Sequence, residues 1–250
     1  MRRVVLVRES YADPPSLGTA LARVTLLGVA SGLLPETFRL SRPPRIVAFG
    51  SRDRVSPGFG QAIAAASDAG FSPVQRLAGG QAAAFHEGTV AFSWAIPDRS
   101  PREGMRTRFQ VVSAVIADAL RSLGVDARVG PVPGEYCPGD FSVNARGRRK
   151  LMGVGQRVVA GGAHLGGVLV VTGSDVVRAA LLPVYEALGL AWDPASAGSI
   201  EDEVTGISWA AAEAAIVSAL STRFELEEGT LPAETIGLAQ RLAPQYALLP

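Results

Sequence analysis

The chain has little cysteine, histidine or charge. Its 250 residues include one cysteine, Cys137, and two histidines, His86 and His164. A single cysteine cannot form an intramolecular disulfide, so nothing in the sequence requires an oxidising compartment. Two isolated histidines argue against a zinc site. The usual phosphate-binding glycine loops are also missing, since no Walker-type or G-x-G-x-x-G pattern joins a strand to a helix.

Long apolar runs are lacking as well. The most apolar stretch, residues 20–35, is shorter than a membrane span and contains Arg23. The N-terminal apolar run is too short for a secretory signal. Charged residues make up 19% of the chain and the formal net charge is +1, so no extended basic face is expected. We therefore expect a cytoplasmic protein that binds neither nucleic acid nor membranes.

Hydrophobic residues make up 48% of the chain, and 28 glycines and 17 prolines divide it into alternating elements. The apolar spacing predicts strands at residues 4–8, 37–40, 46–49, 74–77, 89–96, 140–143, 151–159 and 165–172. It predicts helices at residues 15–34, 57–69, 102–123, 174–188, 208–224 and 232–242. We expect one α+β domain over residues 1–250, in which about 193–250 form a helical C-terminal extension.

The stretch "GEYCPGDFSVNARGRRKLMGVGQRV" contains Cys137 and, thirteen residues later, Lys150. A lone cysteine often packs as a small inert hydrophobe. Pro138 and Gly139 follow Cys137, however, and indicate a loop entering a strand, where reactive groups are often held. Lys150, on the return strand of a hairpin with a long turn, could stabilise a thiolate. Both interpretations of Cys137 stay open on these residues alone.

A second stretch, "VQRLAGGQAAAFHEGTV", contains the adjacent glycines Gly79 and Gly80, followed by His86. Paired glycines allow a backbone to approach a ligand closely. They are equally typical of a tight turn between strands.

Four segments together resemble the lipoate–protein ligase and octanoyltransferase family, which shares its fold with biotin–protein ligase. "RLAGGQAAAFHEG" is similar to the family's glycine loop, "RGRRKLMGVGQR" to its lysine strand, and "AHLGGVLVV" to the strand that follows. "EYCPGDFSV" resembles the cysteine segment of the amidotransferase branch. The resemblance implies a mixed, mostly antiparallel sheet flanked by helices.

The resemblance also implies acyl transfer, in which an octanoyl or lipoyl group passes through a thioester on Cys137 to a carrier lysine. Cys137 and Lys150 are the implied catalytic residues. We expect Lys150 to be a sheet-edge lysine whose loss leaves the fold intact. The implied substrate-binding residues are Arg76, Gly79, Gly80, Gln81, His86, Asp140, Gly153 and Gln156.

Two alternatives accompany this interpretation. One is an ATP-dependent lipoate–protein ligase that acts through a lipoyl-adenylate and requires ATP and Mg. The transfer, in contrast, requires no cofactor. We expect no resident metal site for either reaction. Gln81 replaces the ligases' third loop glycine and favours transfer. The other alternative is a non-catalytic acyl-carrier-binding protein. The implied partners are lipoyl-carrier domains, either the glycine cleavage H protein or a 2-oxoacid dehydrogenase E2, or acyl carrier protein.

Overall fold

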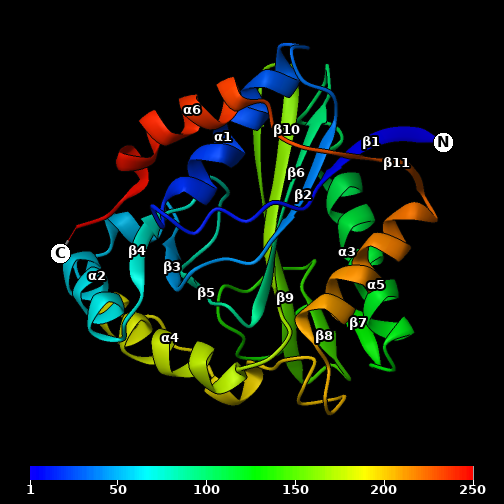
Figure 1. The fold of residues 1–250 in the computed structure, drawn as a ribbon. Coiled ribbons are helices and arrows are strands. Elements are labelled where there is room, and N and C mark those ends of the chain that lie inside the picture. Colours follow the sequence, from blue (N-terminus) through cyan, green and yellow to red (C-terminus); the bar gives the residue numbers. More distant parts are fainter. Residues whose placement is uncertain (250) are drawn as a thin grey trace.

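The computed structural model describes residues 1–249, in which helices cover both faces of a large twisted sheet (Figure 1). The main sheet has eight strands in the order β11-β1-β2-β6-β10-β9-β8-β7. Its strands are β1 (Arg2–Val7), β2 (Thr37–Ser41), β6 (Thr89–Pro97), β7 (Ala127–Val129), β8 (Val143–Ala145), β9 (Arg149–Val159), β10 (Gly162–Val170) and β11 (Phe224–Gly229). A second sheet has the order β4-β3-β5, with β3 (Ile46–Phe49), β4 (Ser72–Gln75) and β5 (Ala83–Phe85).

The predicted mixed, mostly antiparallel sheet is confirmed. The pairings of β2 with β6, β6 with β10, β10 with β9, β9 with β8 and β8 with β7 are antiparallel. Only β1 pairs in parallel within this sheet, with β2 on one side and β11 on the other. The long strands β6, β10 and β9 are therefore neighbours in the middle of the main sheet.

Within residues 1–249, six α-helices pack on these sheets: α1 (Leu17–Ala30), α2 (Phe59–Asp68), α3 (Met105–Ser122), α4 (Ser174–Leu188), α5 (Trp209–Ser221) and α6 (Ala233–Leu242). The helix α3 buries Val112, Ile116 and Leu120 at helical spacing, and packs with α5 on one face of the main sheet. The helices α1 and α6 lie over the other face, and α2 and α4 pack beside the small sheet (Figure 1).

Most predicted elements are present with shifted ends, but the hairpin before Lys150 differs. The predicted strand at 140–143 is wrong: the strand is β8, and only residues 146–148 connect it to β9. Arg146 and Gly147 take φ angles of 56° and 72°, and the backbone N–H of Gly147 donates to Asn144 Oδ1 at 2.7 Å. This hydrogen bond and the two positive φ angles form a turn that is shorter than the long turn predicted from the sequence.

The sequence patterns missed β5, β7 and β11. The first two have three residues each, too few to show a period. In β11 the segment "FELEEG" has one buried residue, Phe224, because β11 is the edge of the sheet. The segment that we expected to be helical thus also supplies a strand to the main sheet.

Candidate active site

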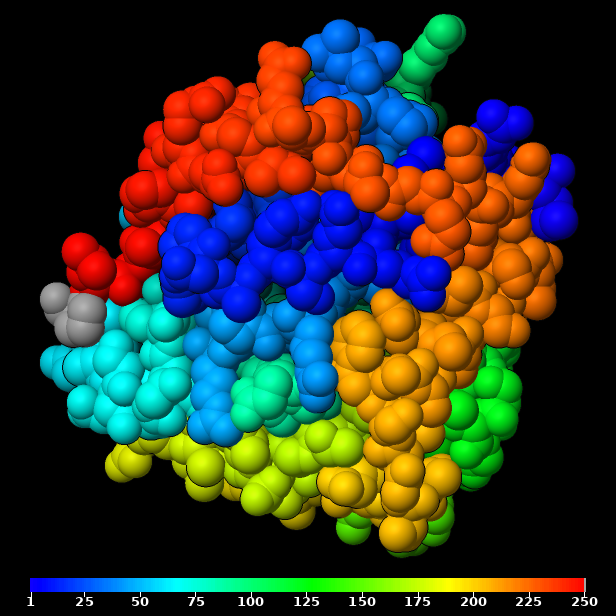
Figure 2. Space-filling view, viewed as in Figure 1, coloured from blue at the N-terminus to red at the C-terminus, as the bar shows by residue number. Residues whose placement is uncertain are grey.

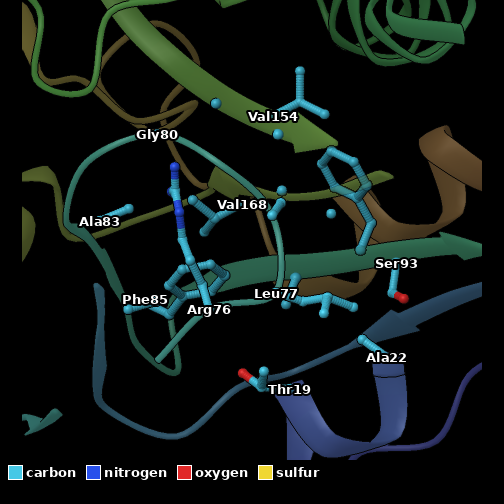
Figure 3. Close-up of a pocket in the computed structure, with 18 of the residues that line it drawn as sticks. Thr19, Ala22, Arg76, Leu77, Gly80, Ala83, Phe85, Ser93, Val154 and Val168 are labelled. Atoms are coloured by element: carbon cyan, nitrogen blue, oxygen red, sulfur yellow. The ribbon is translucent and has the colours of Figure 1, made fainter. Parts of the chain in front are cut away.

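A cavity of about 390 Å³ lies between the loop that follows β4, the strands β9 and β10, and the helix α1. The Gly79–Gly80 loop and the Lys150 strand both line it. Much of the wall is apolar, and Figure 3 shows several of these side chains around the opening. The apolar wall includes Leu77, Phe85, Phe92, Val154 and Val168.

Glycines in β9 make room for the glycine loop and for the Lys150 side chain. A Cβ on Gly155 would lie 2.8 Å from the carbonyl oxygen of Gly79 and 2.9 Å from the Ala78 Cβ. A Cβ on Gly153 would lie 3.2 Å from the Lys150 Cε. The loop therefore rests directly on the strand, at a distance that side chains on β9 would prevent.

Cys137 is half-buried at the cavity wall, in a tightly held loop. Its Sγ accepts hydrogen bonds from the backbone N–H of Gln81 at 3.2 Å and from Arg76 Nη2 at 3.5 Å. Its own N–H donates to Tyr185 Oη at 2.9 Å, and its φ angle is 43°, which non-glycine residues rarely adopt. Two donors, one of them cationic, are the groups that would stabilise a thiolate at this sulfur.

Lys150 is 1% exposed and lies beneath the Cys137 loop. Its Nζ donates to Glu135 Oε1 at 3.3 Å, to the Tyr136 carbonyl at 3.0 Å and to the Cys137 carbonyl at 2.7 Å. An ammonium group has three donors, so all of them are engaged. Burial lowers the pKa of Lys150, while the charge of Glu135 opposes this shift.

One expectation about Lys150 is wrong. It is not at a sheet edge, because β9 lies between β10 and β8. The cation in hydrogen-bonding distance of the sulfur is Arg76, whereas Lys150 reaches the backbone carbonyl of Cys137. Sequence spacing could not show this, since it fixes which strand carries Lys150 but not which loop atoms lie above it.

Glu135 was missed by the sequence analysis. Its side chain is 0% exposed, and Oε1 accepts from the Gly139 N–H at 2.9 Å and from Ser142 Oγ at 2.8 Å, in addition to Lys150. Its Oε2 accepts from the Val132 N–H at 3.0 Å. Glu135 therefore fixes both sides of the Cys137 loop. The only signal in the sequence is a charged residue two positions before the cysteine, which by itself suggests a solvated position.

The structure brings most of the predicted residues together, but not all. Arg76, Gly79, Gly80, Gly153 and Gln156 line the cavity with Cys137 and Lys150, and Gln81 reaches the sulfur through its backbone. Gln156 Oε1 accepts from Arg108 Nε at 2.7 Å, which holds its amide at the cavity wall. His86 is buried away from the cavity lining, with its Nδ1 accepting from the Gly88 N–H at 3.1 Å. Asp140 is exposed and outside the lining.

Within residues 1–249, no group of three or more His, Cys, Asp or Glu side chains is arranged to hold a metal ion. In the same part of the chain, no helix combines the length and the apolar character needed to cross a membrane.

Residues 14–221 match the family model described as the lipoyl protein ligase A/B catalytic domain. The octanoyl-[GcvH]:protein N-octanoyltransferase of Geobacillus kaustophilus is 30% identical over 182 residues, which is 73% of this chain and 61% of that protein. The enzyme of the same name from Anoxybacillus flavithermus is 28% identical over 163 residues, 65% of this chain and 58% of that protein. The chain thus matches about three fifths of the length of these relatives.

Solved structures share the fold. A bipartite lipoate protein ligase of Thermoplasma acidophilum aligns with a TM-score of 0.77 at 18% identity, covering 98% of this chain and 93% of that one. Lipoate-protein ligase A bound with ATP aligns with a TM-score of 0.75 at 17% identity, covering 98% and 95%. The family match spans most of the chain, and the solved structures have the fold that the four sequence segments implied. This chain belongs to the lipoyl protein ligase A/B catalytic-domain family.

Proposed function

We propose that this protein transfers an octanoyl or lipoyl group, through a thioester on Cys137, to a lysine of a lipoyl-carrier domain. The observation that carries the proposal is the placement of the Cys137 sulfur. It lies at the wall of a mainly apolar cavity, beneath the backbone N–H of Gln81 and the guanidinium of Arg76. The names of the transferase relatives support the same reaction.

The reaction has two acyl exchanges. The Cys137 thiolate attacks the acyl carbonyl of the donor, the bond from that carbonyl to the donor breaks, and the leaving group takes up a proton from water. The acceptor lysine, as a neutral amine, then attacks the thioester carbonyl, the C–S bond breaks, the thiolate is restored, and the nitrogen releases one proton to water. Acyl carbonyls develop negative charge in both steps, and donors aimed at that oxygen lower the barrier.

Lys150 is the group that donates to the acyl carbonyl in this reaction. Its three donors are engaged with Glu135, Tyr136 and Cys137. To reach the acyl oxygen, Nζ exchanges one of these acceptors for the substrate. The 2.7 Å bond to the Cys137 carbonyl couples this exchange to the position of the cysteine itself.

The partner is a carrier domain that bears the target lysine. The relatives are named for action on octanoyl-GcvH, and a structural neighbour was solved as part of a system with an E2 lipoyl domain. Glycine cleavage H protein and E2 are therefore the two partners to test. The third expected partner, acyl carrier protein, has no such support.

An ATP-dependent ligase is the second candidate, because the fold is shared with a lipoate-protein ligase bound with ATP. Its substrates would be the free acid, ATP and Mg, whereas transfer through Cys137 requires no cofactor. The position of Gln81 argues for transfer, since its backbone N–H is directed to the sulfur.

Intact-mass spectrometry separates the two candidates. The protein is mixed with octanoyl-H protein, or with octanoate and lipoate, with and without ATP and Mg. An octanoyl adduct that forms without ATP and is absent in Cys137→Ser supports the transferase. Product that requires ATP and survives Cys137→Ser establishes a ligase. A protein that forms neither adduct nor product but still binds acylated H protein is a non-catalytic binder.

A further inference from the structure

Arg76, the cation that reaches the Cys137 sulfur, has one donor that is not used. Its Nη2 donates to Cys137 Sγ at 3.5 Å and to the Gly79 carbonyl, and its side chain extends towards Gly80 (Figure 3). Its Nε is buried and has no hydrogen-bond partner. A guanidinium is a planar group with five donors, so an acceptor at Nε would fix the direction in which Nη2 points.

Asp53 is a buried acidic residue close to this arginine. It begins the short 3₁₀ helix Asp53–Val55 and is 2% exposed. Its Oδ2 accepts from the Gly50 backbone N–H at 2.7 Å, and a Cβ on Gly50 would lie 3.6 Å from Arg76 Nε. Its other oxygen, Oδ1, is buried and has no hydrogen-bond partner. Asp53 is not among the residues that line the cavity, so a substrate in the cavity would not contact it.

The two unused atoms are complementary. A carboxylate oxygen is an acceptor and Nε is a donor, so one hydrogen bond between them satisfies both. Buried polar groups without partners are costly, and a carboxylate–guanidinium bond is among the stronger ones inside proteins. Burial raises the pKa of Asp53, while the Gly50 N–H and the positive charge of Arg76 both oppose this shift. The electrostatic effect of Arg76 thus reaches the carboxyl group.

We propose that Asp53 is a positioning residue, whose Oδ1 accepts from Arg76 Nε and holds the guanidinium against the Cys137 sulfur. Its Oδ2 keeps the bond to Gly50, where an added Cβ would overlap the Gly80 carbonyl oxygen. One carboxylate then fixes both the arginine and the backbone beneath the glycine loop. The inference rests on the proposed function, since it explains how the proposed nucleophile becomes a thiolate.

Two other roles of Asp53 predict different results. A carboxylate that only accepts from Gly50 would leave the ionisation of Cys137 unchanged when it is replaced by an amide. A carboxylate that acts only as a nearby negative charge would disfavour the thiolate, so its removal would favour ionisation. Loss of a positioning contact to Arg76 instead makes the thiolate harder to form. The variant Asp53→Asn separates the three roles, because its amide oxygen still accepts from Gly50 but its NH₂ group cannot accept from Nε.

The other ionisable groups around the sulfur are the same in every variant of this test. Lys150 and Glu135 form their own ion pair beneath the Cys137 loop. Burial raises the pKa of Tyr136 and of Tyr185, so both hydroxyls stay neutral where a thiol titrates. Differences between the variants therefore report on Asp53 and Arg76.

The test measures the rate of Cys137 alkylation by iodoacetamide as a function of pH, on the full chain. Cys137 is the only cysteine in the sequence, so intact mass reports its modification directly. The proteins are wild type, Asp53→Asn, Arg76→Gln and the double variant that combines the two. Alkylation needs no acyl donor, so it decides the role of Asp53 whether or not the acyl transfer of the proposed function occurs.

Asp202→Asn is the matched control. Asp202 Oδ2 accepts from the Ser199 backbone N–H at 2.9 Å, three positions before it, just as Asp53 accepts from Gly50. Asp202 is exposed and is not among the residues that line the cavity. Its replacement is expected to leave the alkylation profile unchanged.

Arg76→Gln is expected to raise the pH midpoint of alkylation by about one unit, because a cation beside the sulfur favours the thiolate. Asp53→Asn is expected to raise the midpoint by at least about half a unit, and to add no further rise once Arg76 is replaced. A midpoint that stays constant or falls in Asp53→Asn overturns the proposal. A rise of the same size with and without Arg76 also overturns it.

Thermal unfolding shows whether each variant is folded. If Asp53→Asn does not fold, the proton chemical shift of the Arg76 Nε–H in wild type decides, with Arg76→Gln used to assign the signal. A downfield position relative to the exposed Arg52, as in a charge-assisted hydrogen bond, supports the proposal. The same position as Arg52 refutes it.

Discussion

Lys150 and Glu135 form a buried ion pair beneath the cysteine loop, with Nζ 3.3 Å from Oε1 and side-chain exposures of 1% and 0%. Removal of one partner from such a pair leaves an uncompensated charge in the interior. The pair thus connects the β9 strand to the loop that carries Cys137, and a change at Lys150 affects stability as well as chemistry.

Lys150→Met is expected to lower the free energy of unfolding by about 3–5 kcal/mol, because it strands the Glu135 carboxylate. Adding Glu135→Gln should recover part of the loss, and urea unfolding measures both variants. Arg128→Met is the control: its pair with Asp126 is 58% and 51% exposed, so the loss of unfolding free energy should be much smaller than for Lys150→Met. Equal losses of unfolding free energy in Lys150→Met and Arg128→Met would show that the buried pair stabilises the fold no more than the exposed pair.

Gly80→Ala is expected to slow alkylation of Cys137 by iodoacetamide several-fold. Gly80 has a φ of 106°, and an added Cβ would lie 1.8 Å from Arg76 Nη2 and 2.8 Å from Cys137 Sγ. The change therefore displaces the guanidinium that donates to the sulfur. Gly79→Ala is the matched control, since its Cβ would meet nothing within 4 Å. The same alkylation rate in both alanine variants would contradict this role of the loop.

Tyr185→Phe is expected to lower the free energy of unfolding by about 1–3 kcal/mol. The Tyr185 hydroxyl accepts from the Cys137 N–H and donates to the Ala82 carbonyl, both at 2.9 Å, so its loss leaves two backbone groups unsatisfied. Thermal and urea unfolding provide the measurement. Tyr246→Phe, in the cluster beside α6, serves as the comparison. A Tyr185→Phe protein as stable as wild type would show that the cysteine loop holds its shape without this bridge.

His164 makes stability depend on pH. Burial lowers its pKa from 6.5 to about 3, so the folded state resists protonation that the unfolded state accepts. Its contribution is fully present above pH 6.5 and is lost as the pH falls towards 3, by up to about 1.4 kcal/mol per pH unit. The free energy of unfolding of wild type minus that of His164→Asn should therefore decrease over this range. A difference that stays constant with pH would be evidence against a buried neutral histidine.

Much of the fold could be predicted because the long elements show clear periods. The strand β3 was predicted with its observed ends, and the helix predicted at residues 102–123 is present as α3, Met105–Ser122. Short strands such as β5 could not be found, since three residues contain no period. The edge strand β11 was not predicted, because its mostly exposed positions carry acidic residues.

The sequence identified residues of the site better than it identified the contacts between them. The sequence singled out Cys137, Lys150 and the Gly79–Gly80 loop, and all of them line one cavity. The burial of Glu135 and Asp53 could not be foreseen, because charged residues are usually exposed and only tertiary packing decides otherwise. The pairing of Arg76 with the sulfur is likewise a contact between segments 61 positions apart.

The pairing of β1 with β11 also has a consequence for the order of folding. Arg2 is paired with Phe224, and Figure 2 shows the dark blue N-terminal segment between the red and orange C-terminal segments and the light blue segment that follows it in the sequence. During synthesis, one edge of β1 therefore stays without its strand partner until more than two hundred further residues have been translated. Contacts over such separations form late and slowly, so the nascent chain exposes an open strand edge to chaperones until β11 arrives.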